Sequence, residues 1–145
     1  MKIDLHAVGR LRKGPEKALC DDYLDRFAKA GRGLGLPPVR VHEAGDDAAL
    51  ARALPDGAVL VALDERGSLL SSPDLAARIG AWRDDARDVA FAIGGADGHG
   101  AVRDRADLLL SFGPMVWPHM LARVMLCEQL YRAASILAGS PYHRD

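Results

Sequence analysis

The sequence of 145 residues contains no run of about 18 apolar residues, the length that a membrane-spanning helix needs. Its opening segment, residues 1–6, carries an acid and has a strand-like pattern, so we expect no signal peptide. Only two cysteines occur, Cys20 and Cys127, and we expect both to be free buried thiols in a reducing cytoplasm. No linker, internal repeat or low-complexity segment interrupts the chain, so we expect one domain over residues 1–145.

An excess of positive charge is also missing, because the chain has a formal net charge of −1 at pH 7. This balance excludes a protein that coats nucleic acid through its overall field, and RNA binding would need a local positive patch. One candidate patch follows the first predicted strand and consists of Arg10, Arg12 and Lys13. A concentrated positive loop of this kind suits contacts with phosphate groups.

Arg123 and Arg132 are further candidates for RNA contacts and lie nine residues apart in the last predicted helix. At about 3.6 residues per turn this spacing is about 2.5 turns, so the two side chains lie on opposite sides of the helix. We expect one arginine to pair with Glu128 and the other to face the substrate or a partner subunit.

Metal-ligand spacings such as C-x₂-C or H-x₃-H do not occur in the sequence. The possible ligands in its second half are scattered: His99, His119, Cys127 and His143. We therefore expect no bound metal. His6 lies in one predicted strand and His42 near another, and both are expected to be structural or surface histidines.

Apolar segments bounded by turn residues alternate with segments of helical periodicity along the chain. Strands are predicted at residues 2–8, 39–43, 58–63, 88–93 and 107–112. Helices are predicted at residues 15–30, 46–53, 72–83, 101–105 and 118–138, the third with Ser72 as its N-cap. Apolar strands separated by helices are typical of a single α/β domain with a mostly parallel sheet and helices on both faces.

The last predicted helix has clear signals at both ends. Pro118 is expected at its first position, where the missing N–H would have no partner, and Gly139 followed by Pro141 is expected to stop it. Apolar residues surround much of its circumference, so it has more than one face to bury. The chain continues with an aromatic ring, a ring that titrates near neutral pH and a constant positive charge: Tyr142, His143 and Arg144.

Three predicted strand ends carry unusual residues, and open α/β sheets bind ligands beyond the carboxyl ends of their strands. These ends are residues 63–67, 93–99 and 112–118. Gly94, Gly95 and Gly98 allow the backbone to come close to a ligand, although their spacing differs from the G-x-G-x-x-G of a dinucleotide site. Because a Gly-Pro loop follows the next strand, we expect the two loops to share a ligand pocket.

Several segments spread along the whole chain carry a more specific pattern: residues 5–9, 60–64, 88–95, 117–119, 128–133 and 141–144, together with Arg123. The most specific of them are Glu-Gln-Leu-Tyr-Arg-Ala at 128–133 and Pro-Tyr-His-Arg at 141–144. This set resembles the RlmH (YbeA-like) family of SPOUT-class methyltransferases. The resemblance implies S-adenosylmethionine-dependent N3 methylation of a pseudouridine in 23S ribosomal RNA, on assembled ribosomes in the cytoplasm. It also implies a homodimer and a C-terminal trefoil knot.

The resemblance marks the cofactor-binding residues as Leu63, Gly95, Gly113, Pro114, Met115, Val116, Trp117 and Pro118. Backbone groups of these loops suit the adenine edge, and the apolar side chains suit the walls of a pocket. By composition alone, Met115 and Trp117 would be assigned to a hydrophobic core, and their place in a strand-end loop makes the two assignments about equally good. A Gly95→Val change is expected to block cofactor binding, because a branched side chain would fill the space through which the cofactor approaches the backbone.

On the substrate side, three roles are expected of the C-terminal residues. His143 accepts the N3 proton, Arg144 stabilises the developing negative charge or holds a phosphate, and Tyr142 stacks on a splayed base. The structural alternative is that this segment only orders the knot. Two other function classes remain open, a non-catalytic ribosome- or nucleotide-binding module with the same fold and a Rossmann-like nucleotide enzyme of another class.

Overall fold

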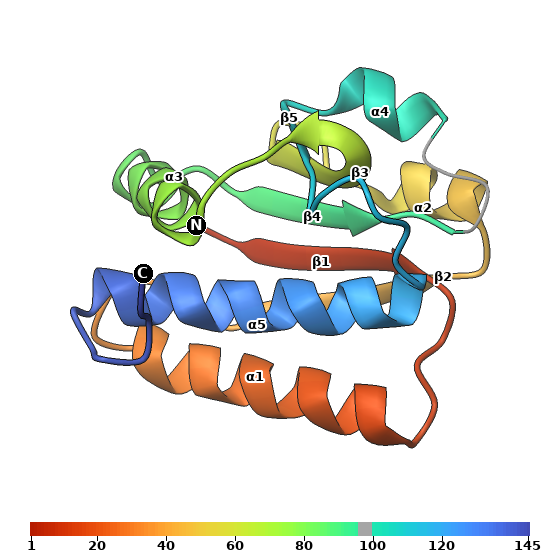
Figure 1. Cartoon of the computed structure of the whole chain (residues 1–145). Coiled ribbons are helices and arrows are strands. Elements are labelled where there is room, and N and C mark those ends of the chain that lie inside the picture. Colours follow the sequence, from red (N-terminus) through yellow and green to blue (C-terminus); the bar gives the residue numbers. More distant parts are fainter. Residues whose placement is uncertain (96–99) are drawn as a thin grey trace.

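The computed structural model describes residues 1–95 and 100–145 (Figure 1). Its strands are β1 (Ile3–Val8), β2 (Val39–Ala44), β3 (Val59–Ser68), β4 (Val89–Ile93) and β5 (Leu108–Leu110). Its helices are α1 (Pro15–Gly31), α2 (Asp47–Ala53), α3 (Ser72–Asp84), α4 (Ala101–Arg105) and α5 (His119–Leu137). Every predicted strand and helix is confirmed, and the differences concern only where elements begin and end.

The five strands form one sheet in the order β2-β1-β4-β3-β5, and every neighbouring pair runs parallel. This confirms the expectation of a parallel α/β sheet. β1, β4 and β3 occupy the centre, which explains why β4 and residues 59–63 of β3 are apolar over consecutive residues, whereas β1 carries buried Asp4 and His6. The carboxyl ends of β1 and β4 and the bend of β3 lie on one side of the sheet, together with the loop that leads from β5 to α5 (Figure 1).

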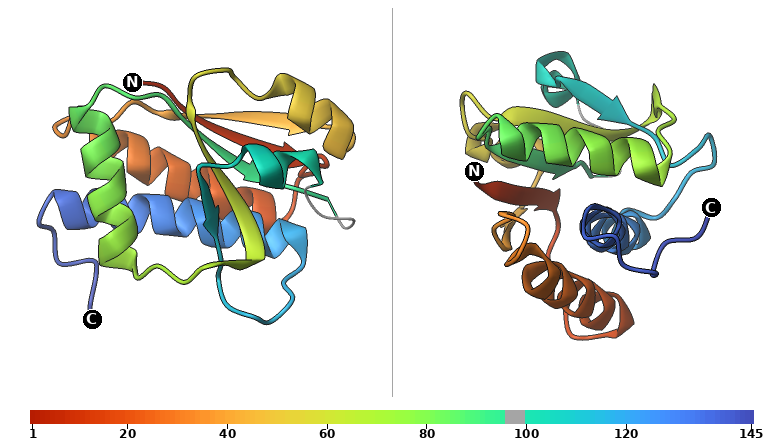
Figure 2. Two further views of the ribbon diagram at one scale, coloured as in Figure 1. Left: turned by 90° about the horizontal axis from the view of Figure 1, so that it is seen from above. Right: turned by 90° about the vertical axis from the view of Figure 1, so that its left-hand side faces the viewer.

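Alternate residues of the central strands enter two separate hydrophobic cores. Val61 and Phe91 point into the larger core, which α1, α3 and α5 complete. Ala62 and Ala92 point into a smaller core on the opposite face, beneath α2 and α4. Figures 1 and 2 show α1 and α5 side by side across one face of the sheet. The helices on both faces therefore follow from a strand period of two applied to strands buried on both sides.

Helix α5 confirms the prediction of several buried faces, because it packs against α1, α3 and β4. Its predicted start is wrong by one position: Pro118 is the N-cap, and His119 is the first helical residue. Its predicted end is confirmed by Gly139, which adopts φ +70°. The N–H of Gly139 donates to Ile136 O at 3.0 Å and that of Ser140 to Ser135 O at 3.0 Å, the bond pattern of a Schellman cap.

Two further boundaries differ from the predictions. Ser71, not Ser72, caps α3, since its hydroxyl oxygen accepts the N–H of Asp74 at 3.1 Å. β3 continues to Ser68 instead of ending at Leu63, because after an irregularity Ser68 pairs with Leu110 of β5. Sequence patterns miss this extension, since residues 64–68 are polar and their pairing partner lies about 40 residues away.

Cys20 and Cys127 are free and buried in the interface between α1 and α5, as expected. Among the helices in the described part of the chain, none combines the length and apolar character needed to cross a membrane.

Candidate functional site

A cavity of about 750 Å³ lies at the carboxyl ends of β3, β4 and β5. Seven of the eight predicted cofactor-binding residues line it: Leu63, Gly95, Gly113, Met115, Val116, Trp117 and Pro118. Pro114 is exposed and is not among the described lining residues. These residues come from β3, from the end of β4 and from the loop after β5, so the three segments share one cavity, and ligand binding there stays a prediction.

The loop that follows β5 is anchored by Ser111, whose side chain is buried. Its hydroxyl lies 3.0 Å from the carbonyl oxygen of Glu65 and accepts the N–H of Gly113, also at 3.0 Å. Gly113 adopts φ +109°, a backbone conformation that L side chains rarely reach. The glycine at this position therefore sets the path of the loop across the mouth of the cavity.

The residues after that anchor project into solvent. The exposed fractions are 71% for Met115, 83% for Val116 and 42% for Trp117. Apolar side chains of this size are rarely left this exposed in a row on a monomer. The core alternative for Met115 and Trp117 is therefore wrong, and the loop leaves an apolar surface exposed on this chain.

Sequence reasoning missed a buried ion pair in the cavity wall. The Asp64 side chain is only 3% exposed, and Arg103 of α4 donates to its carboxylate from Nε at 2.7 Å. The backbone N–H of Arg66 donates to the other carboxylate oxygen at 2.9 Å. The available signal was an acid directly after a buried strand, but its partner lies 39 residues away in a short helix. The pair places one positive and one negative side chain beside the apolar wall.

Gly95 lines the cavity, but the reason given for its sensitivity is corrected by the structure. A Cβ on Gly95 would meet Val8 Cγ1 at 3.2 Å and Asp47 Oδ2 at 3.3 Å, so it points toward β1 and α2. The Gly95 N–H donates to Asp47 Oδ1 at 3.0 Å. A larger residue would thus disturb the packing beneath the pocket before it met a ligand. The neighbouring positions Ala96, Asp97, Gly98 and His99 lie outside the described residues.

The basic loop Arg10, Arg12 and Lys13 is exposed between β1 and α1. It starts beside the cavity, because a Cβ on Gly9 would lie 3.9 Å from Nε2 of His119, a lining residue. The prediction of a local positive patch is compatible with this placement, and RNA contact by these residues stays a prediction.

Arg123 is buried, contrary to the prediction that it faces the substrate or a partner subunit. Its side chain is only 5% exposed and donates to Glu43 Oε2 at 2.6 Å and to Gly9 O at 2.8 Å. Glu43 in turn accepts the N–H of Leu11 at 2.7 Å. Burial alone would raise the pKa of Glu43, but the hydrogen bonds from Arg123 and Leu11 outweigh it and lower that pKa. Arg123 therefore holds the basic loop from inside, and an RNA contact by its own side chain is at odds with its burial.

The C-terminal residues form a second network. Arg132 donates to Glu128 at 2.7 Å, as predicted for one of the two arginines, and its NH1 lies 3.1 Å from His143 Nδ1. Since a guanidinium only donates, Nδ1 accepts, and the neutral ring donates from Nε2 to Asp145 at 2.8 Å. Both ring nitrogens of His143 are thereby occupied.

Tyr142 is held by the same network. Its hydroxyl donates to Glu128 at 3.3 Å, and the guanidinium of Arg132 lies 4.7 Å from its ring centre. The ring of Tyr131 lies 4.7 Å away at a tilt of 43°. Burial, followed by the charge of Glu128, raises the pKa of the Tyr142 hydroxyl. Arg144, in contrast, is exposed.

The cavity and the C-terminal segment lie toward opposite ends of α5, and Figure 1 shows the loop from β5 entering α5 at one end and the C-terminal segment leaving it at the other. His119 and Ala122 of the first helical turn line the cavity, whereas Arg132 holds the C-terminal residues. Arg132 lies ten positions after Ala122, which corresponds to about 15 Å along the helix at about 1.5 Å per residue. Among the described residues, none beyond Ala122 lines the cavity. Within one chain, the predicted cofactor residues and the predicted substrate residues therefore do not meet.

Comparison with known proteins gives full-length matches. Residues 1–143 match the protein family described as "Predicted SPOUT methyltransferase". The ribosomal RNA large subunit methyltransferase H of Paracoccus denitrificans is 64% identical, over 100% of both chains. The protein of the same name from Ruegeria pomeroyi is 62% identical, over 99% of both chains. Among solved structures, the SpoU methyltransferase AviRb from Streptomyces viridochromogenes, in complex with AdoMet, covers 96% of this chain and 59% of its own, with a TM-score of 0.46 and 16% identity.

Proposed function

Since the chain belongs to the SPOUT methyltransferase family, we propose that it methylates N3 of a pseudouridine in 23S ribosomal RNA, with S-adenosylmethionine as methyl donor. The observation that carries the proposal is the cavity at the strand ends, which gathers seven residues that the family resemblance marked for the cofactor. Support for the substrate class comes from full-length relatives at 60% identity or more whose name is ribosomal RNA large subunit methyltransferase H. The working location that follows is the cytoplasm, where ribosomes are assembled.

The cavity fits the cofactor in size and chemistry. Its volume of about 750 Å³ falls within the range of about 300–1,000 Å³ typical of sites for small organic ligands. Leu63, Val116 and Trp117 would supply apolar walls, and the backbone groups of Gly95 and Gly113 would face the polar edges of the adenine. When bound, S-adenosylmethionine supplies an electrophilic methyl group on a sulfonium. No metal is needed for that chemistry.

The acceptor side requires a group that lowers the cost of removing the N3 proton. Arg144 suits this role, because it is exposed and its guanidinium can stabilise negative charge on the base oxygens. His143 can take up a proton at Nδ1 only after Arg132 releases that atom, so we assign it first to orienting the segment. A stacking role for Tyr142 stays a prediction and would use the part of the ring that Arg132 leaves open.

We further propose that the working form is a homodimer in which the C-terminal residues of one subunit complete the cavity of the other. The distance along α5 separates the two sets within one chain, and an enzyme needs them together. The exposed apolar residues around the cavity supply a surface to bury: Met115, Val116, Trp117, Met120 and Leu121. We also propose the C-terminal trefoil knot that the resemblance implies. The packing of α5 against both α1 and α3 is compatible with it.

The direct test is methyl transfer from labelled S-adenosylmethionine to ribosomes that lack the modification, with cofactor binding measured in parallel by calorimetry. Stoichiometric label in 23S RNA at a pseudouridine is the expected result. Cofactor binding without transfer would favour a non-catalytic binding module, and absence of binding would remove the methyltransferase proposal.

The dimer has its own test. Light scattering at micromolar concentration should give twice the chain mass. Co-expressing a variant defective in the cavity, Gly113→Val, with a variant defective in the C-terminal segment, Arg144→Ala, should restore about a quarter of the activity, because about half of the dimers are mixed and each of these carries one intact composite site of two. A monomer, or no rescue by co-expression, contradicts the shared site while leaving the reaction itself untouched.

A further inference from the structure

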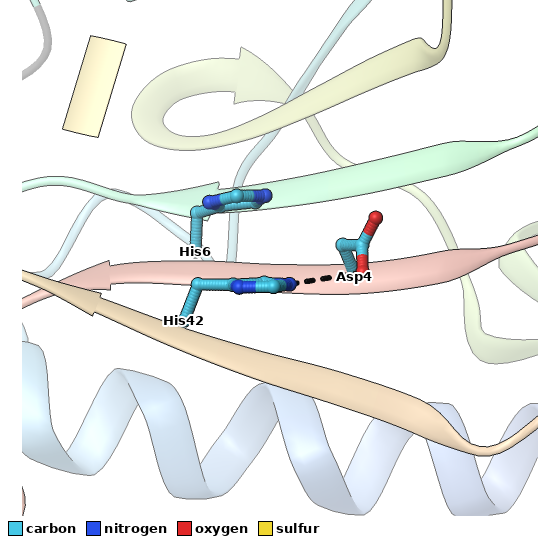
Figure 3. A group of neighbouring side chains, drawn as sticks. All are labelled: Asp4, His6 and His42. Carbon is cyan, nitrogen blue, oxygen red and sulfur yellow. Dashed lines mark hydrogen bonds and ion pairs between the residues drawn. The ribbon is translucent and has the colours of Figure 1, made fainter. Parts of the chain in front are cut away.

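A cluster of polar side chains lies in the sheet away from the cavity, where β1 meets the edge strand β2. His6 and His42 occupy paired positions of the two strands, and Asp4 precedes His6 by two residues on the same face. Figure 3 shows both imidazole rings extending from adjacent strands toward Asp4. The rings stack at 4.5 Å between centres, with 14° between their planes. None of the three residues is among the described lining residues of the cavity.

The hydrogen bonds of this cluster are uneven. The Asp4 carboxylate receives Nε2 of His42 at 3.0 Å and two N–H groups of Arg40 at 2.8 and 3.1 Å. His6 is only 4% exposed, and its Nε2 is a buried nitrogen that has no hydrogen-bond partner among the described residues. A buried polar atom of this kind normally has a partner, so an unsatisfied one requires an explanation.

The protonation states of the cluster suit a positive ligand. Burial, followed by the charge of His42, lowers the pKa of His6, so its ring is neutral at neutral pH and keeps a lone pair. Burial alone would raise the pKa of Asp4, but the hydrogen bonds and charges of Arg40 and His42 outweigh it and lower that pKa. A neutral imidazole and an ionised carboxylate are the forms in which these groups bind metal ions.

We propose that Asp4, His6 and His42 bind one divalent transition-metal ion, with zinc as the preferred ion. One ligand atom from each residue lies within 4.8 Å of the others, and the ligand atoms of a tetrahedral zinc site are separated by about 3.3–3.5 Å. The His42 and Asp4 atoms are already at 3.0 Å, and closure requires that the two stacked rings tilt until their Nε2 lone pairs converge on the ion. Two histidines and one carboxylate form a set that zinc accepts, with water in the fourth position.

Binding rearranges two hydrogen bonds without displacing the backbone. Nε2 of His42 turns from donor to ligand, so its ring then carries the proton on Nδ1. Arg40 releases Oδ1 of Asp4 and keeps Oδ2, which is possible because its side chain is 56% exposed. In the absence of the ion, Arg40 supplies the positive charge that the buried carboxylate needs. The ion would then tie the edge strand β2 to the centre of the sheet.

The sequence-based expectation of no bound metal rested on short ligand spacings such as H-x₃-H, and the residues of this cluster do not follow such a spacing. His6 and His42 are 36 residues apart in the sequence, and only parallel pairing of β1 with β2 makes them neighbours. The same pairing fixes Asp4 on their face, because residues two apart in a strand point the same way.

The test uses the full-length chain, freed of metal by chelation and titrated with zinc chloride in a calorimeter. We expect one zinc per chain, and cobalt(II) in its place should give the strong visible absorption of a tetrahedral site. His42→Gln should weaken zinc binding by about a hundredfold or more, since it removes a direct ligand. His42 is 43% exposed, so this variant is expected to fold, and His6→Asn provides the buried counterpart.

Matched variants exclude other ligands. Cys20→Ser and His143→Gln remove possible zinc ligands elsewhere and should leave the affinity unchanged, and Arg40→Gln should tighten zinc binding by removing a competing charge. Absence of zinc uptake by the parent, or uptake that persists in both His42→Gln and His6→Asn, overturns the proposal. A partner for His6 Nε2 would in that case be an ordered water.

Discussion

The two halves of α5 differ in what surrounds them: the N-terminal end borders a cavity, and the C-terminal half carries a network of charged hydrogen bonds. At its N-terminal end, an open cavity is built largely from backbone and apolar surface, and the exposed Met115, Val116 and Trp117 stand beside it. In its C-terminal half, Glu128 and Arg132 hold the C-terminal segment through charged hydrogen bonds. The N-terminal end therefore offers space for a ligand, whereas the side chains of the C-terminal half bond to one another.

This difference teaches what each end can tolerate. A site made of backbone groups depends on the path of the chain, so glycines and loop anchors such as Ser111 matter there. A network of side chains depends on the identity of each member, because Glu128 accepts from both Arg132 and Tyr142, and Arg132 also donates to His143. We therefore expect substitutions of loop glycines at the cavity to affect cofactor affinity, and substitutions of side chains in the C-terminal segment to affect turnover.

The largest effect is expected from Arg144→Ala. Loss of the exposed guanidinium should lower turnover about a hundredfold, the scale on which removal of one charge-stabilising donor acts, and cofactor affinity should stay unchanged. Single-turnover methylation and calorimetry measure the two quantities. Arg78→Ala, at an exposed arginine of α3, is the control and should change neither. If Arg144→Ala lowered cofactor affinity as much as turnover, the proposed separation between a cofactor end and a substrate end of α5 would be wrong.

Arg123→Met tests the buried support under the basic loop. The variant loses charged hydrogen bonds to Glu43 and Gly9, so the free energy of unfolding should fall by about 2 kcal/mol at pH 7. The folded-state pKa of Glu43 is lowered, so its contribution exists above its unfolded-state pKa and disappears as the pH falls through the folded value. Urea unfolding at about pH 7 and about pH 4 should therefore show a smaller difference between variant and parent in acid. A constant difference would show that Glu43 is not the partner that matters.

Gly113→Ala probes the loop over the cavity. At φ +109°, a side chain strains the backbone by about 1–2 kcal/mol, and relaxation of the loop should weaken cofactor binding about tenfold. Gly57→Ala is the matched control, since Gly57 has φ +79°, open space around its Cβ position and no place among the described cavity residues. It should cost similar stability and leave affinity intact. Similar affinity loss in both variants would point to global destabilisation.

The smallest effect is expected from Tyr142→Phe. The change removes one long hydrogen bond to Glu128, at 3.3 Å, and keeps the ring against Arg132, so stability should fall by only about 0.5 kcal/mol. Thermal unfolding measures this, and turnover should stay within about twofold of the parent. A large loss of turnover would instead assign the hydroxyl a direct role with the RNA.

Much of the cavity could be predicted from the sequence, because it obeys a rule about strand ends. Leu63 ends the apolar part of β3 and Gly113 follows β5, and parallel strands present their carboxyl ends at one edge. Arg103 could not be predicted in the same way, since its ion pair with Asp64 depends on how α4 packs. The role of Gly95 was misjudged for a similar reason: the direction of its missing side chain is set by neighbouring Val8 and Asp47.

By itself, the sequence determined the succession of strands and helices, the caps that end α5, and the strand ends that carry the cavity. These features depend on hydrophobic period and on backbone preferences of proline and glycine, which act between residues close in the chain. Only the tertiary structure decided that Arg123 is buried, that His6 and His42 face Asp4, and that the C-terminal residues lie at the far end of α5 from the cavity. The physical reason is that burial and pairing of charged groups depend on which surfaces meet, and strand order and helix packing set those meetings over long separations in the chain.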